Sequence, residues 1–244
     1  MNDYLKLKSF IFFTILLSIN IIYSQSNNKF KPIDVFSLEY VSNPKISPDG
    51  KKVLYVRNFK DIMTDKNHSN IWIIDFDGKN NTPLTTGNKN DFDPTWSNSG
   101  DKFTYKSNSD DTVQLYLYVL GQKSNQKLTN LQNSVSSVDW SEDDKYLVFT
   151  SFVEKPSVSL IKMPEKPKGA KWNDPASEID GIKYRSDGRG YLNQGFSQVF
   201  ILPTEGGTPR QITFLNNNAS SPKWLAKNKI IFSANLHEDS DLEP

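Results

Sequence analysis

The sequence repeats a short motif whose most complete copy is Ile46-Ser47-Pro48-Asp49-Gly50-Lys51, followed by the apolar run Val53-Leu54-Tyr55-Val56. The Asp-Gly pair favours a tight hairpin turn, because glycine readily adopts the positive φ that such a turn needs. The aromatic residue Tyr55 lies 9 residues after Ile46. The motif therefore predicts a tight turn that leads into an apolar strand.

Three degenerate copies of this motif begin at a tryptophan instead of the isoleucine. Each copy leads through a polar turn into an apolar strand with its own aromatic residue, and the pairs are Trp96 with Tyr105, Trp140 with Phe149 and Trp224 with Phe232. The offsets within these pairs are 9, 9 and 8 residues. We expect both aromatics to pack between neighbouring units, because large aromatic side chains are most often core residues.

A second set of landmarks precedes each tryptophan at a fixed distance. Three apolar-aromatic segments are each followed by a Leu-Thr or Ile-Thr pair: 71–74 with Leu84-Thr85, 115–118 with Leu128-Thr129, and 199–202 with Ile212-Thr213. Trp72 precedes Leu84 by 12 residues, Leu84 precedes Trp96 by 12 residues, and both offsets recur in the other two copies. Three copies in register at three landmarks exclude a chance pattern.

The landmarks describe one unit of alternating strands and turns that recurs along the chain. Trp96 and Trp140 are 44 residues apart, and four strands per unit of roughly 40–50 residues are typical of β-propeller blades. Trp140 and Trp224 are 84 residues apart, so one unit carries an insertion of 40 residues. We predict an all-β chain in which residues 25–244 form a partial β-propeller of about three and a half four-stranded blades. A loop and a hairpin around Asp187-Gly188 are inserted at about 152–191.

The composition excludes several classes of protein. The 244 residues hold 29 Lys+Arg and 28 Asp+Glu, a formal net charge of +1, so no basic surplus is available to neutralise a nucleic acid. No cysteine is present, which excludes disulfides, thiolate metal sites and cysteine nucleophiles. Only two histidines occur, too few for a His-rich metal site. We expect neither a metal nor a cofactor.

The N-terminal segment resembles an export signal rather than part of a fold. Lys6 and Lys8 precede an apolar run over 10–22, and a polar stretch follows. This order is typical of a secretory signal peptide, which we assign to residues 1–24 with cleavage after Ser24. An uncleaved N-terminal anchor is the alternative, although Ser18 and Asn20 interrupt a run that is short for a membrane span. Either interpretation predicts a periplasmic or secreted location, with no membrane contact beyond this segment.

Several polar clusters are candidate sites. The segment His237-Glu238-Asp239-Ser240-Asp241 has metal-ligand residue types, but its spacing matches no ligand pattern and we interpret it as a solvated loop. Asp91 and Asp93, like the pair Asp110-Asp111, could bind calcium, and turn chemistry is the interpretation we favour. We expect His68 to be exposed because it lies in a polar stretch.

The repeat resembles the Ser-Pro-Asp-Gly-Lys blades of TolB-like periplasmic propellers and of the propeller in prolyl oligopeptidase family serine peptidases, such as dipeptidyl-peptidases and acylaminoacyl-peptidases. Pro32-Ile33-Asp34-Val35-Phe36 is similar to the lead-in segment of these peptidases. The stretches 184–191 and 206–213 are similar to their mid-propeller region. The resemblance implies that the propeller caps an α/β-hydrolase domain with a Ser, Asp and His triad and admits only small peptides.

None of that catalytic machinery is found in this sequence. The stretch nearest to a G-x-S-x-G elbow, Gly195-Phe196-Ser197-Gln198-Val199, lacks the second glycine. We assign no catalytic residue and expect the chain alone to be inactive, as the N-terminal portion of an exported serine peptidase. Arg185, Asp187 and Arg189 on the insertion are candidate contacts for a peptide terminus, or else surface charges of the hairpin. A TolB-like propeller that binds protein partners is the alternative function, and a sugar-binding or polysaccharide-active propeller is a third.

Overall fold

The computed structural model describes residues 29–156, 164–172, 179, 181–182 and 184–237. The chain divides into two compact units, 1–38 and 39–244, and the predicted signal peptide at 1–24 lies outside the described residues. In the first unit, the lead-in segment forms a 3-10 helix, η1 (Pro32–Ser37). Proline suits this first position because its fixed φ matches the helix. The Asp34 carboxylate accepts a hydrogen bond from the Lys31 backbone N–H at 2.8 Å.

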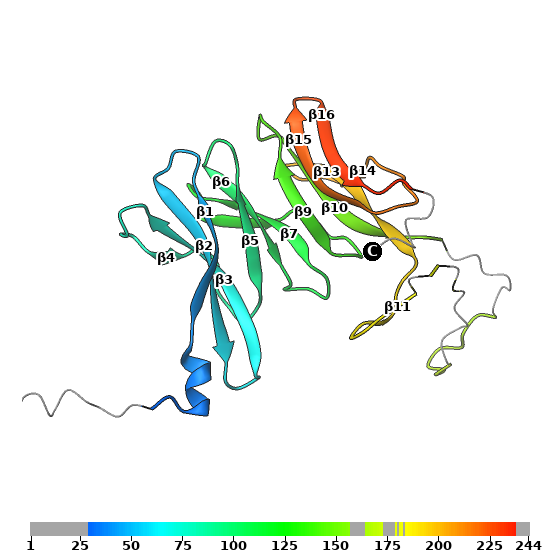
Figure 1. Cartoon of the computed structure of the whole chain (residues 1–244), viewed down its shortest axis with the longest axis horizontal. Coiled ribbons are helices and arrows are strands. Elements are labelled where there is room, and N and C mark those ends of the chain that lie inside the picture. Colours follow the sequence, from blue (N-terminus) through cyan, green and yellow to red (C-terminus); the bar gives the residue numbers. More distant parts are fainter. Residues whose placement is uncertain (1–28, 157–163, 173–178, 180, 183, 238–244) are drawn as a thin grey trace, which may run out of the picture. The chain divides into compact units, whose positions relative to one another are not determined.

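The second unit is built of antiparallel sheets that follow the predicted repeat (Figure 1). The first sheet comprises β1 (Tyr40–Ile46), β2 (Lys52–Asp61), β3 (Lys66–Asp75) and β4 (Thr82–Pro83). The second comprises β5 (Asp91–Trp96), β6 (Lys102–Ser107), β7 (Gln114–Val119) and β8 (Ser124–Lys127). The third comprises β9 (Val135–Trp140), β10 (Tyr146–Glu154), β13 (Gly195–Pro203) and β14 (Arg210–Gln211). A two-stranded sheet of β15 (Ala219–Ala226) and β16 (Lys229–Ala234) follows. Three full blades and half of a fourth confirm the predicted partial propeller.

In the first and third sheets, the turn between the first and second strands is fixed by a serine and an aspartate two residues later. The Ser47 hydroxyl donates to the Asp49 carboxylate at 2.6 Å and accepts from the Lys52 backbone N–H at 2.9 Å. Gly50 has the positive φ of 71° that the motif requires. Ser141 repeats both bonds one unit later, to Asp143 and Tyr146. Local side-chain bonding therefore explains why the motif turns at these positions.

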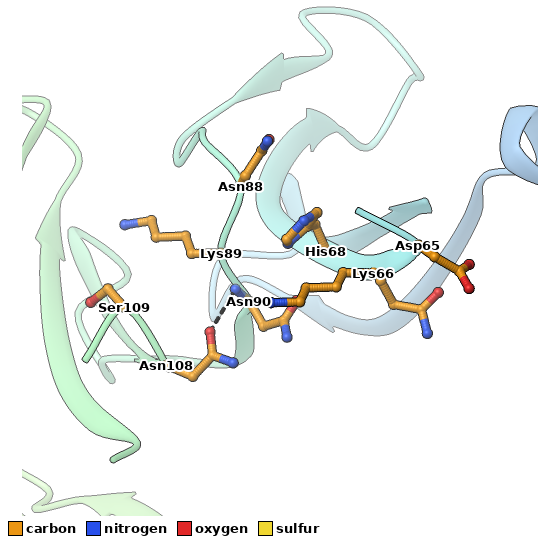
Figure 2. A pocket seen from close by; sticks show the side chains of 9 residues that line it. Asp65, Lys66, His68, Asn88, Lys89, Asn90, Asn108 and Ser109 are labelled. Atoms are coloured by element: carbon orange, nitrogen blue, oxygen red, sulfur yellow. Dashed lines mark hydrogen bonds between the residues drawn. The ribbon is translucent and has the colours of Figure 1, made fainter. Parts of the chain in front are cut away.

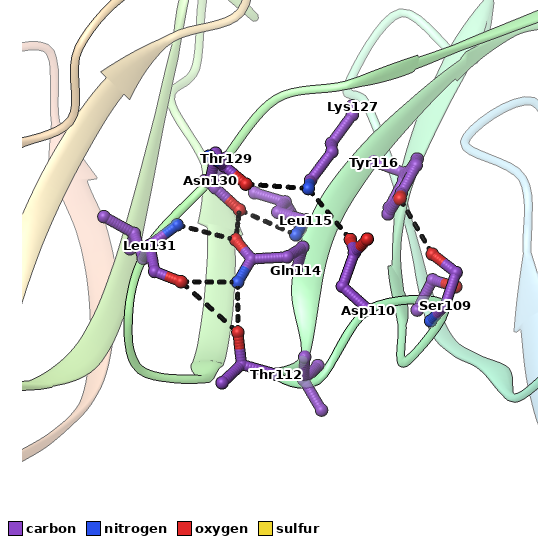
Figure 3. Close-up of polar contacts among 12 residues, drawn as sticks. Ser109, Asp110, Thr112, Gln114, Leu115, Tyr116, Lys127, Thr129, Asn130 and Leu131 are labelled. Atoms are coloured by element: carbon purple, nitrogen blue, oxygen red, sulfur yellow. Dashed lines mark hydrogen bonds and ion pairs between the residues drawn. The ribbon is translucent and has the colours of Figure 1, made fainter. Parts of the chain in front are cut away.

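The threonine of each Leu-Thr or Ile-Thr pair ties its loop to the third strand of the sheet. In the second sheet, Thr129 Oγ1 accepts from the Leu115 backbone N–H at 2.9 Å and donates to the Gln114 side-chain oxygen at 2.8 Å (Figure 3). The same Gln114 oxygen accepts from the Leu131 backbone N–H at 3.0 Å. The third sheet repeats this network with Gln198, Thr213 and Leu215. Buried polar groups are satisfied in this way, as a stable core requires.

The hydrophobic core lies between adjacent sheets. One cluster joins Leu54, Val56, Ile71 and Ile73 of the first sheet to Phe103, Tyr105 and Tyr118 of the second. Another joins Leu115 and Leu117 of the second sheet to Trp140, Leu147, Phe149 and Leu202 of the third. Each buried side chain of this size contributes roughly 1.5–3 kcal/mol to stability. The sheets therefore hold one another through their facing surfaces.

The repeated tryptophans pack between sheets as predicted. The Trp96 indole N–H donates to the Lys45 carbonyl oxygen at 2.9 Å, and the Trp140 indole N–H donates to the Thr95 carbonyl oxygen at 3.1 Å. Each acceptor directly precedes the first residue of the motif in the preceding sheet. The following aromatics Tyr105 and Phe149 are fully buried, whereas Phe232 in the two-stranded sheet is exposed. Burial of the aromatic thus depends on a flanking sheet.

Candidate functional site

Strand order places equivalent connections at the same edge of the sheets. The turns between second and third strands and the segments that enter the next sheet lie at the same ends of the strands, because the strands are antiparallel. We call this side, where the strand ends meet their connections, one edge of the sheets. The insertion that separates β10 from β13 is such a connection. Its described part contains a small hairpin, β11 (Arg185–Ser186) and β12 (Gly190–Tyr191). The serine-aspartate turns lie at the opposite edge.

A pocket of about 800 Å³ opens at the edge that carries the insertion, between the first and second sheets. It is lined by residues of three connections: Asp65, Lys66, Asn67 and His68; Asn88, Lys89 and Asn90; and Asn108 and Ser109 (Figure 2). Backbone hydrogen bonds connect the three segments. The Ser69 N–H donates to the Lys89 carbonyl oxygen at 3.1 Å, and the Asn108 N–H donates to the Asn90 carbonyl oxygen at 3.1 Å. The lining contains no aliphatic or aromatic side chain except the imidazole of His68, so the pocket suits a polar ligand.

His68 corrects one prediction from the sequence. We expected an exposed side chain, but the residue is only 8% exposed. The polar run that contains it extends the start of β3, where His68 pairs with Phe59 of β2 and the two rings lie 5.7 Å apart. Its Nδ1 is buried and has no hydrogen-bond partner among the described residues. A buried, unpaired ring nitrogen in a pocket wall is a recognition group that a ligand could satisfy.

Asp91 also differs from the expected turn residue. It is the first residue of β5 and is fully buried, and neither carboxylate oxygen has a hydrogen-bond partner among the described residues. The Lys89 ammonium lies 3.6 Å away. Burial, reinforced by the charge of Asp91, raises the pKa of the Tyr105 phenol well above its ordinary value. Lys89, which lines the pocket, is therefore held close to a buried carboxylate.

Two of the other candidate calcium ligands, Asp93 and Asp110, are engaged by internal contacts. Asp93 lies at a bulge in β5 with φ 54° and binds the Lys106 ammonium at 2.7 Å. Burial raises the pKa of Asp93, but the bonds from Lys106 and Asn43 outweigh it and lower the pKa below its ordinary value. Asp110 pairs with Lys127 at 2.8 Å in the turn after β6 (Figure 3). Over the described ranges, no group of three His, Asp or Glu side chains could hold a metal ion.

The candidate contacts on the insertion lie on the small hairpin. Arg185 is in β11, Asp187 is in the turn and Arg189 precedes β12, and all three are exposed. The hairpin is closed by a backbone bond from Leu192 N–H to the Tyr184 carbonyl oxygen at 2.8 Å. In the part of the chain that the structure describes, no side-chain bond joins these three charges to the pocket. Their role as substrate contacts stays a prediction.

The remaining candidates do not form a catalytic centre. Ser197 lies within the extended strand β13, and its backbone N–H donates to the Asn218 side-chain oxygen at 2.8 Å. A nucleophile elbow would instead need a sharp strand-to-helix turn. His237 is exposed, and the acidic residues that follow it lie outside the described residues. Among the described helices, none is long and apolar enough to cross a membrane.

The pocket was not identified from the sequence, because its walls come from three connections that are far apart along the chain. The asparagines and lysines at 66–67, 88–90 and 108 look like ordinary polar loops. A usable signal was present nevertheless. Once the sequence is divided into blades, these stretches occupy the connections that antiparallel order brings to one edge.

Comparison with known proteins supports the same fold. The model of the TolB beta propeller domain matches residues 38–171, more than half of the chain. An uncharacterized peptidase, YuxL, of Bacillus subtilis is 29% identical over 211 residues, which are 85% of this chain and 31% of that protein. Dipeptidyl-peptidase 5 of Porphyromonas endodontalis is 22% identical over 56% of this chain and 20% of its own length. The chain thus spans less than a third of the length of these relatives.

A solved structure has the same architecture. The acylaminoacyl peptidase of Pyrococcus horikoshii superposes on 81% of this chain with a TM-score of 0.57, at 16% sequence identity and over 28% of its own length. At this identity the likeness shows the fold alone. The blade motif, the sheet topology and the matched family model agree. The chain belongs to the TolB beta propeller domain family.

Proposed function

We propose that this chain is the N-terminal propeller portion of an exported serine peptidase that acts on short peptides, with the propeller restricting which peptides reach the catalytic domain. The observation that carries the proposal is a match to a peptidase at 29% identity over 85% of this chain. The matched region is only 31% of that peptidase. The dipeptidyl-peptidase 5 match points to the same class of protein.

The chemistry of the described residues supports a non-catalytic role for the propeller. A serine nucleophile needs a histidine base within hydrogen-bond reach. His68 is one of two histidines in the chain, and its Nδ1 has no hydrogen-bond partner among the described residues. Ser109 lines the same pocket as His68, but its hydroxyl is hydrogen-bonded to the Tyr116 hydroxyl at 2.9 Å, and no bond joins it to His68 among the described residues.

The proposal is tested on the full protein encoded by the gene. Its coding sequence should continue into a G-x-S-x-G elbow, then Asp and His. The purified protein should hydrolyse di- and tripeptide substrates and leave unfolded casein intact, because the propeller would exclude long chains. Equal cleavage of casein would contradict the filtering role. A gene that ends after further blades would contradict the peptidase role.

The family match also supports a second candidate, a TolB-like propeller that binds protein partners without catalysis. The two functions differ in one simple observation. A propeller-only protein needs just a few more blades, whereas a peptidase needs an additional α/β domain. The mass of the mature protein therefore distinguishes them.

Export is part of the proposal and has its own test. The basic start, apolar run and polar exit of residues 1–24 support cleavage after Ser24. N-terminal sequencing of the protein from its native host should then begin at Gln25. A retained N-terminal segment in a membrane fraction would favour the uncleaved anchor.

A further inference from the structure

We propose that the pocket between the first and second sheets binds the carboxylate of a peptide. The proposal rests on the proposed function for one point only, namely that the carboxylate belongs to a short peptide. The carboxylate itself is inferred from the groups that face the pocket. These groups include two ammonium groups and an imidazole, and the side-chain oxygens of Asn67 and Asn108 already accept hydrogen bonds within the protein.

Two asparagines of the pocket, Asn67 and Asn108, present hydrogen-bond donors rather than acceptors to a ligand. The Asn108 side-chain oxygen accepts from the Asn90 backbone N–H at 2.8 Å, as drawn in Figure 2. The Asn67 side-chain oxygen accepts from the Lys60 ammonium at 2.8 Å. Because both oxygens are engaged, the groups left for a ligand are the two Nδ2 amino groups, and each is a donor only.

The lysines add positive charge to these donors. Lys66 makes no ion pair or side-chain hydrogen bond with any described residue, and its ammonium points toward Asn90 in Figure 2. Lys89 lies 3.6 Å from the buried Asp91 carboxylate, and its ammonium is 6.0 Å from the centre of the Tyr116 ring. The one acidic side chain in the lining, Asp65, points away from Lys89 and Asn90. An anionic acceptor would therefore meet the unpaired Lys66 ammonium together with the Lys89 ammonium, whose charge is partly offset by the buried Asp91 carboxylate.

His68 supplies the observation that points most directly to a ligand. The residue is more than nine-tenths buried, lines the pocket and has an unpaired Nδ1. A nitrogen of this kind costs stability unless a partner satisfies it. Once the ring turns so that its Nδ1–H faces the pocket, the imidazole can donate to a carboxylate oxygen beside the donors from Lys66 and Asn108. Charge-assisted bonds of this type are the strong ones in protein recognition.

The test measures binding of labelled tripeptides to the full protein after treatment with a fluorophosphonate, which blocks any catalytic serine. One peptide ends in glutamate with a free C-terminus, and three analogues lack the side-chain carboxylate, the terminal carboxylate or both. Fluorescence anisotropy should show that loss of the recognised carboxylate weakens binding by roughly tenfold or more. The single-carboxylate analogues identify which of the two sources the pocket recognises.

Two variants connect this binding to the pocket. Lys66→Gln removes an unpaired charge, and Asn108→Asp keeps the oxygen that accepts from Asn90 while replacing the donor by an anionic oxygen. Both should weaken binding of the carboxylate peptide by roughly tenfold or more, and higher salt should weaken it further. The control Lys51→Gln makes the same charge change in the turn at the opposite edge and should bind like the wild type.

The inference and the proposed function can fail separately. Equal affinity for all four peptides, wild-type binding by Lys66→Gln, or binding of neutral sugars in place of peptides would overturn the carboxylate site. A protein that hydrolyses peptides and shows any of these results remains a peptidase without this site. A protein without hydrolysis that still binds the carboxylate peptide through Lys66 would keep the site and lose the peptidase role.

Discussion

The Asp144 carboxylate, in the first turn of the third sheet, accepts a hydrogen bond of 2.8 Å from the backbone N–H of Ser99 in the first turn of the second sheet. Its other oxygen accepts from the Asn98 backbone N–H at 2.7 Å. Asp144 occupies the motif position that Gly50 and Gly100 hold in the preceding turns, and it shares their positive φ, at 56°. The third copy of the motif thus replaces the glycine with a residue that links two blades.

Replacing Asp144 by glycine should measure how much this contact between two blades contributes to stability. Glycine tolerates the positive φ, so the substitution removes the carboxylate without adding backbone strain. We expect a loss of about 2 kcal/mol in the free energy of unfolding, because two backbone N–H groups lose a charged acceptor. Urea denaturation of the full protein measures it. Asp144→Asn keeps one acceptor oxygen and should lose less; an unchanged stability of Asp144→Gly would contradict the link.

The same carboxylate predicts a pH dependence of stability. Burial raises the pKa of Asp144, but the bonds from Ser99 and Asn98 outweigh it and lower the pKa below its ordinary 3.8. A lowered folded-state pKa means that the carboxylate stabilises the protein above the unfolded value, and that this contribution disappears as pH falls through the folded value. The Tm difference between wild type and Asp144→Asn should therefore be largest at pH 6–7, roughly, and shrink below about pH 4. A constant difference across this range would argue against the assignment.

The buried Gln114–Thr129 network predicts a second stability effect. Thr129→Val keeps the shape of the side chain but removes the oxygen that accepts from the Leu115 N–H. The buried N–H is then unsatisfied, and the expected cost is about 2 kcal/mol. Thr82→Val in the exposed strand β4 is the matched control and should change stability by about 0.5 kcal/mol or less. Equal effects of the two substitutions would show that the network is dispensable.

Gly195 predicts a steric effect where the inserted segment rejoins the third sheet. A Cβ at this position would collide with the Val153 carbonyl oxygen and lie 2.8 Å from Phe152 Cζ. Gly195→Ala should therefore destabilise the β10–β13 pairing by about 2–3 kcal/mol, measured as a fall in Tm. Gly121→Ala is the control, because a Cβ there has no heavy atom within 4 Å. A stable Gly195→Ala protein would contradict the close packing of these strands.

Much of the fold could be predicted from the sequence because each blade repeats local chemistry. The turn motif at Ser47 and Asp49 recurs at Ser141 and Asp143, and the fixed offsets to Thr85, Thr129 and Thr213 mark the loop that follows each third strand. Local hydrogen bonds and alternating apolar residues determine these elements. The bond from Asp144 to the neighbouring turn could not be foreseen, because it depends on how two sheets pack.

The candidate site was less predictable for a related reason. His68 lies among polar residues, so its local sequence predicted exposure, but β3 begins at Lys66 and the next sheet packs beside it. The local sequence favours a turn role for Asp91, yet this residue lies in β5 and is fully buried. In both cases the neighbouring blade determines burial. Side chains contributed by several connections become a site only after the blades are assembled.

The central claim, that this propeller is the non-catalytic part of a serine peptidase, is tested most directly by labelling the full protein with a fluorophosphonate and locating the modified residue by peptide mapping. We expect one labelled serine outside residues 39–237, with loss of short-peptide hydrolysis in proportion to labelling. A label on Ser197 or another propeller serine, or a protein that neither reacts nor hydrolyses peptides, would contradict it.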